Sequence, residues 1–177
     1  MKFAETSIAG AFVIDPEPIE DERGAFARIF CETEFSAHGL QSTFPQWSIS
    51  RNTRRHTLRG MHYSIGPHAE TKLVRATRGT VFDVIVDLRQ DSPTYLRWFG
   101  ATLDARSDTA VYIPAGVAHG FQTLSDDSEV TYHIHPSYVK DAGRGVRWDD
   151  AAFGIAWPDA AERIMSPRDA GYPDYRP

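Results

Sequence analysis

Two short segments of the chain each place a histidine close to a glycine. The segments are Leu58-Arg59-Gly60-Met61-His62-Tyr63 and Pro114-Ala115-Gly116-Val117-Ala118-His119-Gly120-Phe121. A basic residue, Lys72, follows His62 by ten positions. If the two segments form facing strands, both histidines point into one cavity. This set of side chains is typical of acid–base chemistry on a small anionic substrate.

Composition limits the kind of protein that the chain can form. A chain of 177 residues is long enough for one domain with its own core, and we expect residues 1–177 to form that domain. Hydrophobic residues make up 41% and aromatic residues 12%, which favours a packed fold over a disordered one. The net charge of −5 argues against a nucleic-acid partner, because proteins that bind nucleic acids are usually basic.

Cysteine usage and hydropathy bear on the cellular compartment. Cys31 is the one cysteine of the chain and cannot form an intramolecular disulfide, which fits a reducing compartment. No apolar run approaches the roughly 18 residues of a membrane-spanning helix. The N-terminal segment lacks the apolar core of a signal peptide. We therefore expect a cytoplasmic protein with no membrane segment.

Short alternating stretches, divided by glycine, proline, asparagine and aspartate, predict a chain built from strands. The predicted strands cover residues 11–14, 24–30, 46–51, 72–76, 81–88, 97–103, 110–113, 120–124 and 129–135. One helix is expected at residues 32–38, with Thr33 as a possible N-cap and Gly39 as its end. Strands at this density predict an all-β barrel or sandwich. The tail from residue 149 is rich in proline, and we expect it to be irregular.

Four polar side chains fall where the interior of such a barrel is expected, namely His62, Lys72, His119 and Tyr132. Burying a polar group without a partner is unfavourable, so these side chains require an explanation. The mouth of a small barrel commonly holds a small ligand. We therefore interpret the four side chains as parts of a site.

Some of the same residues are of types that can bind a metal ion. The segment from Pro114 to His119 resembles the second motif of the cupin superfamily, whose metal-binding members carry two histidines one residue apart in their first motif. Here that position holds His62 alone. A ligand set of His62, His68, Glu70 and His119 can be drawn, but its spacing matches no standard site. The sequence predicts no metal and no cofactor.

The order of several motifs resembles one family. The motifs are Asp21-Glu22-Arg23-Gly24, the segment from Leu58 to Tyr63, Lys72-Leu73-Val74-Arg75, Val81-Phe82-Asp83-Val84, Asp91-Ser92-Pro93-Thr94, Ala118-His119-Gly120-Phe121 and Ala156-Trp157-Pro158. With them, residues 10–175 resemble the dTDP-4-dehydrorhamnose 3,5-epimerases, which are metal-free cupin-like enzymes of deoxysugar biosynthesis. The resemblance implies a cupin-like jelly-roll barrel with short peripheral helices.

The resemblance also implies an activity and a partner. The chain would be an isomerase that epimerises a nucleotide-diphosphate 4-keto-6-deoxyhexose at C5, at C3 or at both, with dTDP-4-dehydro-6-deoxyglucose as the default substrate. It would form a homodimer whose N-terminal strands cross to the partner. A ketoisomerase of a related 4-keto sugar and a non-catalytic sugar-binding cupin are the alternatives, and the presence of both His62 and Tyr132 counts against them.

The family pattern assigns roles in catalysis. His62 would be the general base, Tyr132 the general acid, and Asp169 the residue that orients the ring of His62. A proton beside a ketone has a pKa of about 20 against roughly 6.5 for imidazole, a gap of about 18 kcal/mol. Such a gap requires preorganised donors at the oxygen where charge develops, and Lys72 supplies one.

The remaining assignments concern substrate binding, and all of them rest on the resemblance. Lys72, Arg59 and His119 would lie near the C4 oxygen. Arg23, Gln46 and Arg168 would contact the diphosphate end. Phe26 would help to wall the pocket, and Tyr138 would stack on the base. In the crossed dimer, Arg23 and Phe26 would complete the neighbour's pocket.

The chain departs from the family pattern at positions expected to meet the nucleotide. Ser48 replaces a usual asparagine, Arg28 a glutamate, and Gly143 a glutamate, while His133 replaces a lysine after the acid tyrosine. We keep Arg28 and Ser48 among the predicted substrate-binding residues. Thymidine is the default base, and a cytidine or guanosine diphosphate sugar remains open.

Overall fold

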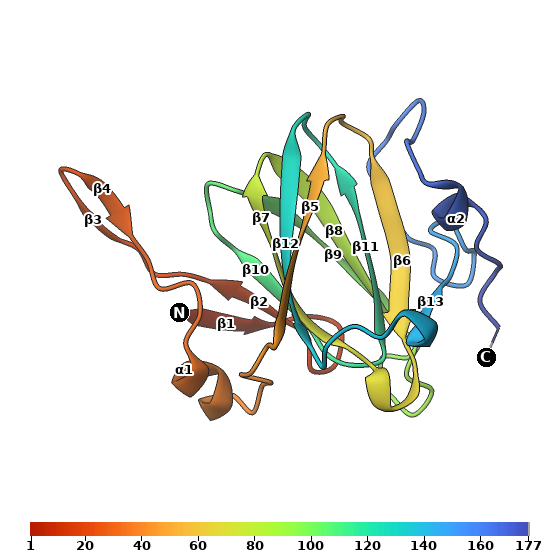
Figure 1. The fold of residues 1–177 in the computed structure, drawn as a ribbon, viewed down its shortest axis with the longest axis horizontal. Coiled ribbons are helices and arrows are strands. Elements are labelled where there is room, and N and C mark those ends of the chain that lie inside the picture. The colour runs from red at the N-terminus through yellow and green to blue at the C-terminus, as the bar shows by residue number, and fades with distance from the viewer. Residues whose placement is uncertain (177) are drawn as a thin grey trace.

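Two antiparallel sheets face each other and enclose the interior of a barrel (Figure 1). The computed structural model describes residues 1–176. The first sheet has the order β1 (Lys2–Glu5), β2 (Phe12–Asp15), β10 (Ala110–Ile113), β7 (Thr71–Arg78), β12 (Ser128–His135) and β5 (Gln46–Asn52). The second has the order β13 (Gly143–Gly145), β6 (Leu58–Ser64), β11 (Val117–Thr123), β8 (Thr80–Asp87) and β9 (Trp98–Asp104). The all-β prediction is confirmed.

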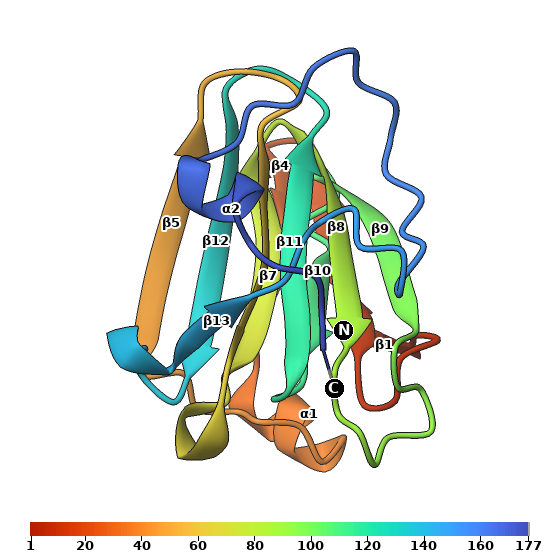
Figure 2. The same cartoon turned by 90° about the vertical axis from the view of Figure 1, so that its right-hand side faces the viewer.

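The remaining elements lie at the periphery. The hairpin of β3 (Ile19–Asp21) and β4 (Gly24–Phe26) projects away from the barrel, at the left of Figure 1. Helix α1 (Glu32–Ala37) lies at one end of the first sheet, and α2 (Pro167–Ala170) lies beside β6 in the second (Figure 2). Among residues 1–176, no helix has the length and apolar character needed to cross a membrane.

Strand β8 shows why the two sheets pack as they do. Val81 and Ile85 point into the barrel and pack in its core, whereas Val84 and Val86 pack on the other face, against Phe153 of the tail. A strand covered on both faces reads as a continuous apolar run, as this one does. Fully burying each such side chain stabilises the fold by roughly 1.5–3 kcal/mol.

Two local predictions are wrong. The strand predicted over residues 24–30 ends at Phe26, because Phe30 turns inward and packs against Phe35 at 4.8 Å between ring centroids. The N-cap of α1 is Cys31 and not Thr33, and no side chain caps the helix. Gly39 does follow its end, with a φ of 69° that favours glycine.

A buried carboxylate closes the loop that follows β8. Asp87 is fully buried and accepts hydrogen bonds from Arg89, Ser92 and Thr94. Burial raises the pKa of Asp87, but these donors outweigh the effect and hold the pKa at about 2. The guanidinium of Arg89 also donates to the Ala9 carbonyl, so this carboxylate links the loop to the N-terminal segment.

We predict that D87N lowers the free energy of unfolding by about 2 kcal/mol at neutral pH. The folded-state pKa lies below that of the unfolded chain, so this stabilisation is present above about pH 4 and is lost as the pH falls toward about 2. Urea unfolding from pH 7 to pH 2 should therefore show the two proteins converging. D91N, at an exposed carboxylate, is the control. An offset between wild type and D87N that does not change with pH would contradict the account.

Candidate active site

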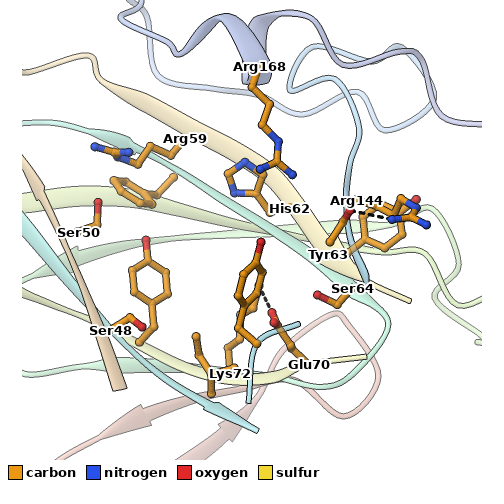
Figure 3. A pocket seen from close by; sticks show the side chains of 15 residues that line it. Ser48, Ser50, Arg59, His62, Tyr63, Ser64, Glu70, Lys72, Arg144 and Arg168 are labelled. Carbon is orange, nitrogen blue, oxygen red and sulfur yellow. Dashed lines mark hydrogen bonds and ion pairs between the residues drawn. The ribbon is translucent and has the colours of Figure 1, made fainter. Parts of the chain in front are cut away.

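A cavity of about 310 Å³ opens between the two sheets (Figure 3). This volume suits a small ligand. Its walls are formed by Ser48, Ser50, Arg59, His62, Tyr63, Ser64, Glu70, Lys72, Phe121, Tyr132, Ile134, Tyr138, Gly143, Arg144 and Arg168. The structure therefore brings together both residues predicted as base and acid and most of the predicted sugar-binding side chains.

Glycines explain how the two histidine segments come together. Gly60 and Gly120 lie opposite each other on β6 and β11, and a Cβ on Gly60 would lie 2.6 Å from the Gly120 Cα. Gly60 also has a φ of 134°, which other residues rarely adopt. The close approach places His62 directly opposite His119 in the register of the two strands. The histidines thus lie on neighbouring strands of one sheet, not on facing strands as the sequence suggested.

His62 is held by a carboxylate from the tail. The Nε2 atom of His62 lies 2.8 Å from Oδ1 of Asp169. Ser166 accepts a hydrogen bond from the Asp169 amide and thereby caps the short turn of α2, while Oδ2 of Asp169 accepts from the amide of Gly60 at 3.3 Å. The tautomer that donates from Nε2 keeps a lone pair on Nδ1, which can accept a proton.

The charge state of Asp169 suits this role. Burial raises its pKa, but the hydrogen bond and the attraction of His62 outweigh burial, so the pKa lies below its usual value. The carboxylate is therefore ionised at neutral pH and stabilises the imidazolium that forms when His62 takes a proton.

Tyr132 enters the cavity from β12, in the opposite sheet. Burial raises the pKa of Tyr132 well above its ordinary value, and the negative charge of Asp83 raises it further, against smaller opposing effects of Arg59 and Ser50. The phenol is therefore fully protonated at neutral pH and can donate a proton. A base on one sheet and an acid on the other can act on opposite faces of a ring held between them.

Two cations of the cavity have fixed partners. Lys72, on β7, places its Nζ 3.2 Å from Oε2 of Glu70. Arg59, on β6, donates from Nε to Oδ1 of Asn52 at 2.7 Å. Both side chains remain on the cavity wall, so they can stabilise negative charge that develops on a bound ligand.

His119 is buried behind the cavity wall. Its Nε2 lies 2.6 Å from Oδ2 of Asp83, and its ring packs edge-on against Tyr132 at 5.9 Å. The side chain of His119 is not among those that line the cavity. The sequence did not indicate this pairing, because the predicted strand began at residue 120 and left His119 outside it, whereas β11 begins at Val117.

Some predicted substrate-binding residues lie elsewhere in this chain. Arg23 and Phe26 are on the projecting hairpin, where Phe26 is 76% exposed and Arg23 pairs with Asp21. Arg28 forms an ion pair with Glu34 at 3.3 Å, next to α1. Gln46 lies at the edge of the cavity, where its side chain accepts from the Tyr138 amide and donates to Ser48.

Several residues of the wall were not predicted as part of the site. They are Ser50, Tyr63, Ser64, Phe121, Ile134 and Arg144. Gly143 was expected to meet the nucleotide, and Glu70 appeared only in the metal-ligand set drawn from the sequence. Tyr63 and Arg144 lie together at one side in Figure 3, near Arg168. Strand alternation could have indicated Ser64, two residues after His62 on the same face. Within residues 1–176, His62, His68, Glu70 and His119 do not form a cluster arranged to hold a metal ion.

The fold and the site define a class of protein. A small cupin-like barrel holds an aspartate-paired histidine, a protonated tyrosine and a lysine around one cavity. Such a site is built to remove and return a proton beside a carbonyl group.

Comparison with known proteins identifies the family. A family model described as dTDP-4-dehydrorhamnose 3,5-epimerase matches residues 5–176. A dTDP-4-dehydrorhamnose 3,5-epimerase of Sinorhizobium fredii (strain NBRC 101917 / NGR234) is 39% identical over 173 residues, which are 98% of this chain and 89% of the relative. The chain belongs to the dTDP-4-dehydrorhamnose 3,5-epimerase family. Its class is that of the carbohydrate epimerases, and the predicted family and isomerase class are confirmed.

Solved structures agree. The dTDP-4-dehydrorhamnose 3,5-epimerase from Elizabethkingia anophelis NUHP1 matches with a TM-score of 0.95 and 36% identity, covering 99% of this chain and 96% of that one. ChmJ, a 3'-monoepimerase from Streptomyces bikiniensis in complex with dTDP-quinovose, matches with a TM-score of 0.88 and 35% identity, covering 97% and 86%. The cupin-like jelly-roll prediction is confirmed.

Proposed function

We propose that this chain epimerises a nucleotide-diphosphate 4-keto-6-deoxyhexose through His62 as general base and Tyr132 as general acid. The observation that carries the proposal is the hydrogen bond between His62 and Asp169 on a cavity that Tyr132 enters from the opposite sheet. Family membership supports the substrate class, and the complex of ChmJ with dTDP-quinovose supports a dTDP-linked 6-deoxy sugar as the kind of ligand that this family binds.

The reaction proceeds in two proton transfers. His62 removes a proton beside the C4 ketone, and the electron pair moves onto the C4 oxygen to give an enolate. Lys72 stabilises that oxygen as charge develops. Tyr132 then gives its proton to the same carbon from the opposite face, which inverts the centre. His62 and Tyr132 exchange protons with solvent, and the enzyme returns to its starting state.

We predict that H62A abolishes both inversion and solvent deuterium exchange at C5, since no enolate forms. Y132F keeps the ring and its packing but removes the donor, so it should slow inversion by about 10² to 10⁴. Exchange with retention should persist in Y132F, because His62 can return a solvent-derived proton to the face it came from. NMR of the sugar in deuterium oxide measures both quantities.

The opposite pattern would reverse the assignment. If H62A retains deuterium exchange at C5 and Y132F loses it, the roles of base and acid are assigned the wrong way round. If H62A lowers only the thermal stability, His62 is structural. Deuterium at C3 and C5 is read separately in the wild type, and this shows whether one or both centres react. A wild type with no exchange at either centre would favour a non-catalytic sugar-binding cupin.

We further propose that the nucleotide preference is relaxed or shifted relative to thymidine. Gly143 lines the cavity, and a Cβ there would lie 3.6 Å from the Tyr138 hydroxyl and 3.5 Å from the Lys140 carbonyl. Both are ordinary contacts, so a side chain would fit and its absence leaves room beside Tyr138. Ser48, which lines the cavity from β5 of the first sheet, is shorter than the asparagine usual in the family.

The expected result is that dTDP, CDP and GDP bind within about 100-fold of one another, or about 2.7 kcal/mol. G143E should increase the preference for dTDP, because it restores the family's usual side chain at a backbone φ of −67° that any residue can adopt. Calorimetric titration of both proteins with the three diphosphates measures the preference. A wild type that favours dTDP by more than about 100-fold would show that these departures have no effect.

We also propose a homodimer in which the hairpin of β3 and β4 completes the partner's site. Ile19 and Phe26 of the hairpin are 72% and 76% exposed. An isolated two-stranded hairpin is at best marginally stable in water. Strand β5 forms a sheet edge and carries Trp47, which is 71% exposed. Both features support burial against a second copy.

We predict that two inactive variants recover activity when mixed. R23A and H62A chains, unfolded and refolded together, should regain about a quarter of wild-type activity, since half of the dimers then hold one complete site. H62A mixed with Y132F is the control and should stay inactive, because each site would lack one residue of its own chain. No recovery by R23A and H62A, with mixed dimers demonstrated by mass spectrometry, would contradict the proposal.

A cytoplasmic location is the last part of the proposal. The unpaired Cys31 supports a reducing compartment. Fractionation of the native host's cells, with the protein detected by antibody, tests it.

A further inference from the structure

Glu70 is a buried carboxylate on the wall of the cavity. Its side chain is 5% exposed and lies at the start of β7, two residues before Lys72. Its Oε2 is 3.2 Å from Nζ of Lys72, and Figure 3 shows the two residues beside each other in the lower part of the view. Its second oxygen, Oε1, is buried without a hydrogen-bond partner in the part of the chain that the structure describes.

Lys72 depends on this contact for its position. A lysine side chain has a flexible four-carbon stem, and its ammonium is a point charge with three donors. The ion pair with Glu70 keeps the ammonium on the cavity wall, where its donors can reach a ligand. A donor stabilises a developing negative charge best when it is already in place, because no reorganisation is then needed during the reaction.

We propose that Glu70 is a positioning residue for the epimerisation: its oxygen, 3.2 Å from Nζ of Lys72, holds the ammonium at the C4 oxygen of the substrate. This inference rests on the function proposed above. Glu70 acts through Lys72 and touches neither reacting carbon.

An acceptor oxygen close to the ammonium, and not the negative charge, is what Glu70 contributes in this proposal. A carboxylate beside a developing enolate repels it, so the negative charge of Glu70 opposes the reaction. Burying a carboxylate with one oxygen unpaired is also unfavourable. The useful property is an acceptor oxygen at a fixed distance from Nζ. Glutamine has such an oxygen on a side chain of the same length, and alanine has none.

The test compares E70A, E70Q, K72A and the double variant E70A/K72A in deuterium exchange at C5 of saturating dTDP-4-dehydro-6-deoxyglucose. E70A should lower the exchange rate by about 10² to 10³, the usual effect of losing a preorganised donor. E70Q should recover most of that loss. In the K72A background, E70A should have no further effect, because the two residues act as one unit. KM should change little, since the diphosphate end is untouched.

Two controls remove a purely structural explanation. Thermal unfolding of every variant shows whether E70A is folded, and E162A changes an exposed glutamate outside the cavity. E70Q as slow as E70A would overturn the proposal, because the charge would then be what matters. A full further loss from E70A in the K72A background would also overturn it. If the wild type shows no exchange at all, the proposed function fails, and the role of Glu70 fails with it.

Discussion

The site depends on one hydrogen bond between distant parts of the chain, that between Asp169 and His62. The two residues are 107 positions apart, so the bond forms only when the tail folds back over the second sheet. Backbone bonds hold the tail there, with the amides of Leu58 and Met61 donating to the carbonyls of Ile164 and Val146. The orientation of the base is therefore a consequence of tertiary folding, and a barrel without its tail would carry a histidine with an undefined tautomer.

The two sheets divide the chemistry between them. The second sheet supplies His62 and Arg59, and the first supplies Tyr132 and Lys72. Their separation is set by the barrel core, where residues such as Val74 of β7 and Phe121 of β11 pack together. Packed interiors resist small displacements, so His62 and Tyr132, the proposed base and acid, keep a fixed gap across which a ring can lie. The packing that stabilises the core therefore also fixes the geometry of the site.

The sequence predicted the parts of this arrangement that local pattern determines. The long alternating run that became β8 was found with nearly correct ends, and His62, Lys72 and Tyr132 were placed in one interior. The three-residue strands β3 and β13 were missed, because three residues show no periodicity. The list of predicted strands also lacked β1 and β6, although β6 carries His62. The contact of Asp83 with His119 was missed for another reason: the two residues are 36 positions apart, and such a pairing leaves no local signal. Thr33 does not cap the helix, because the packing of Phe35 in the core determines where the helix begins.

The position of strand β5 explains both the open side of the cavity and the exposed edge of the first sheet. Strand β5 lines the cavity with Ser48 and Ser50, and the alternate side chains Trp47 and Ile49 point away from it into solvent. Within residues 1–176, no strand pairs with the free edge of β5. A partner segment added along that edge would cover the apolar side chains and close the cavity in a single step. In the proposed homodimer, the exposed hairpin that bears Arg23 is the segment of the partner that would lie there, because it carries the exposed Ile19 and Phe26.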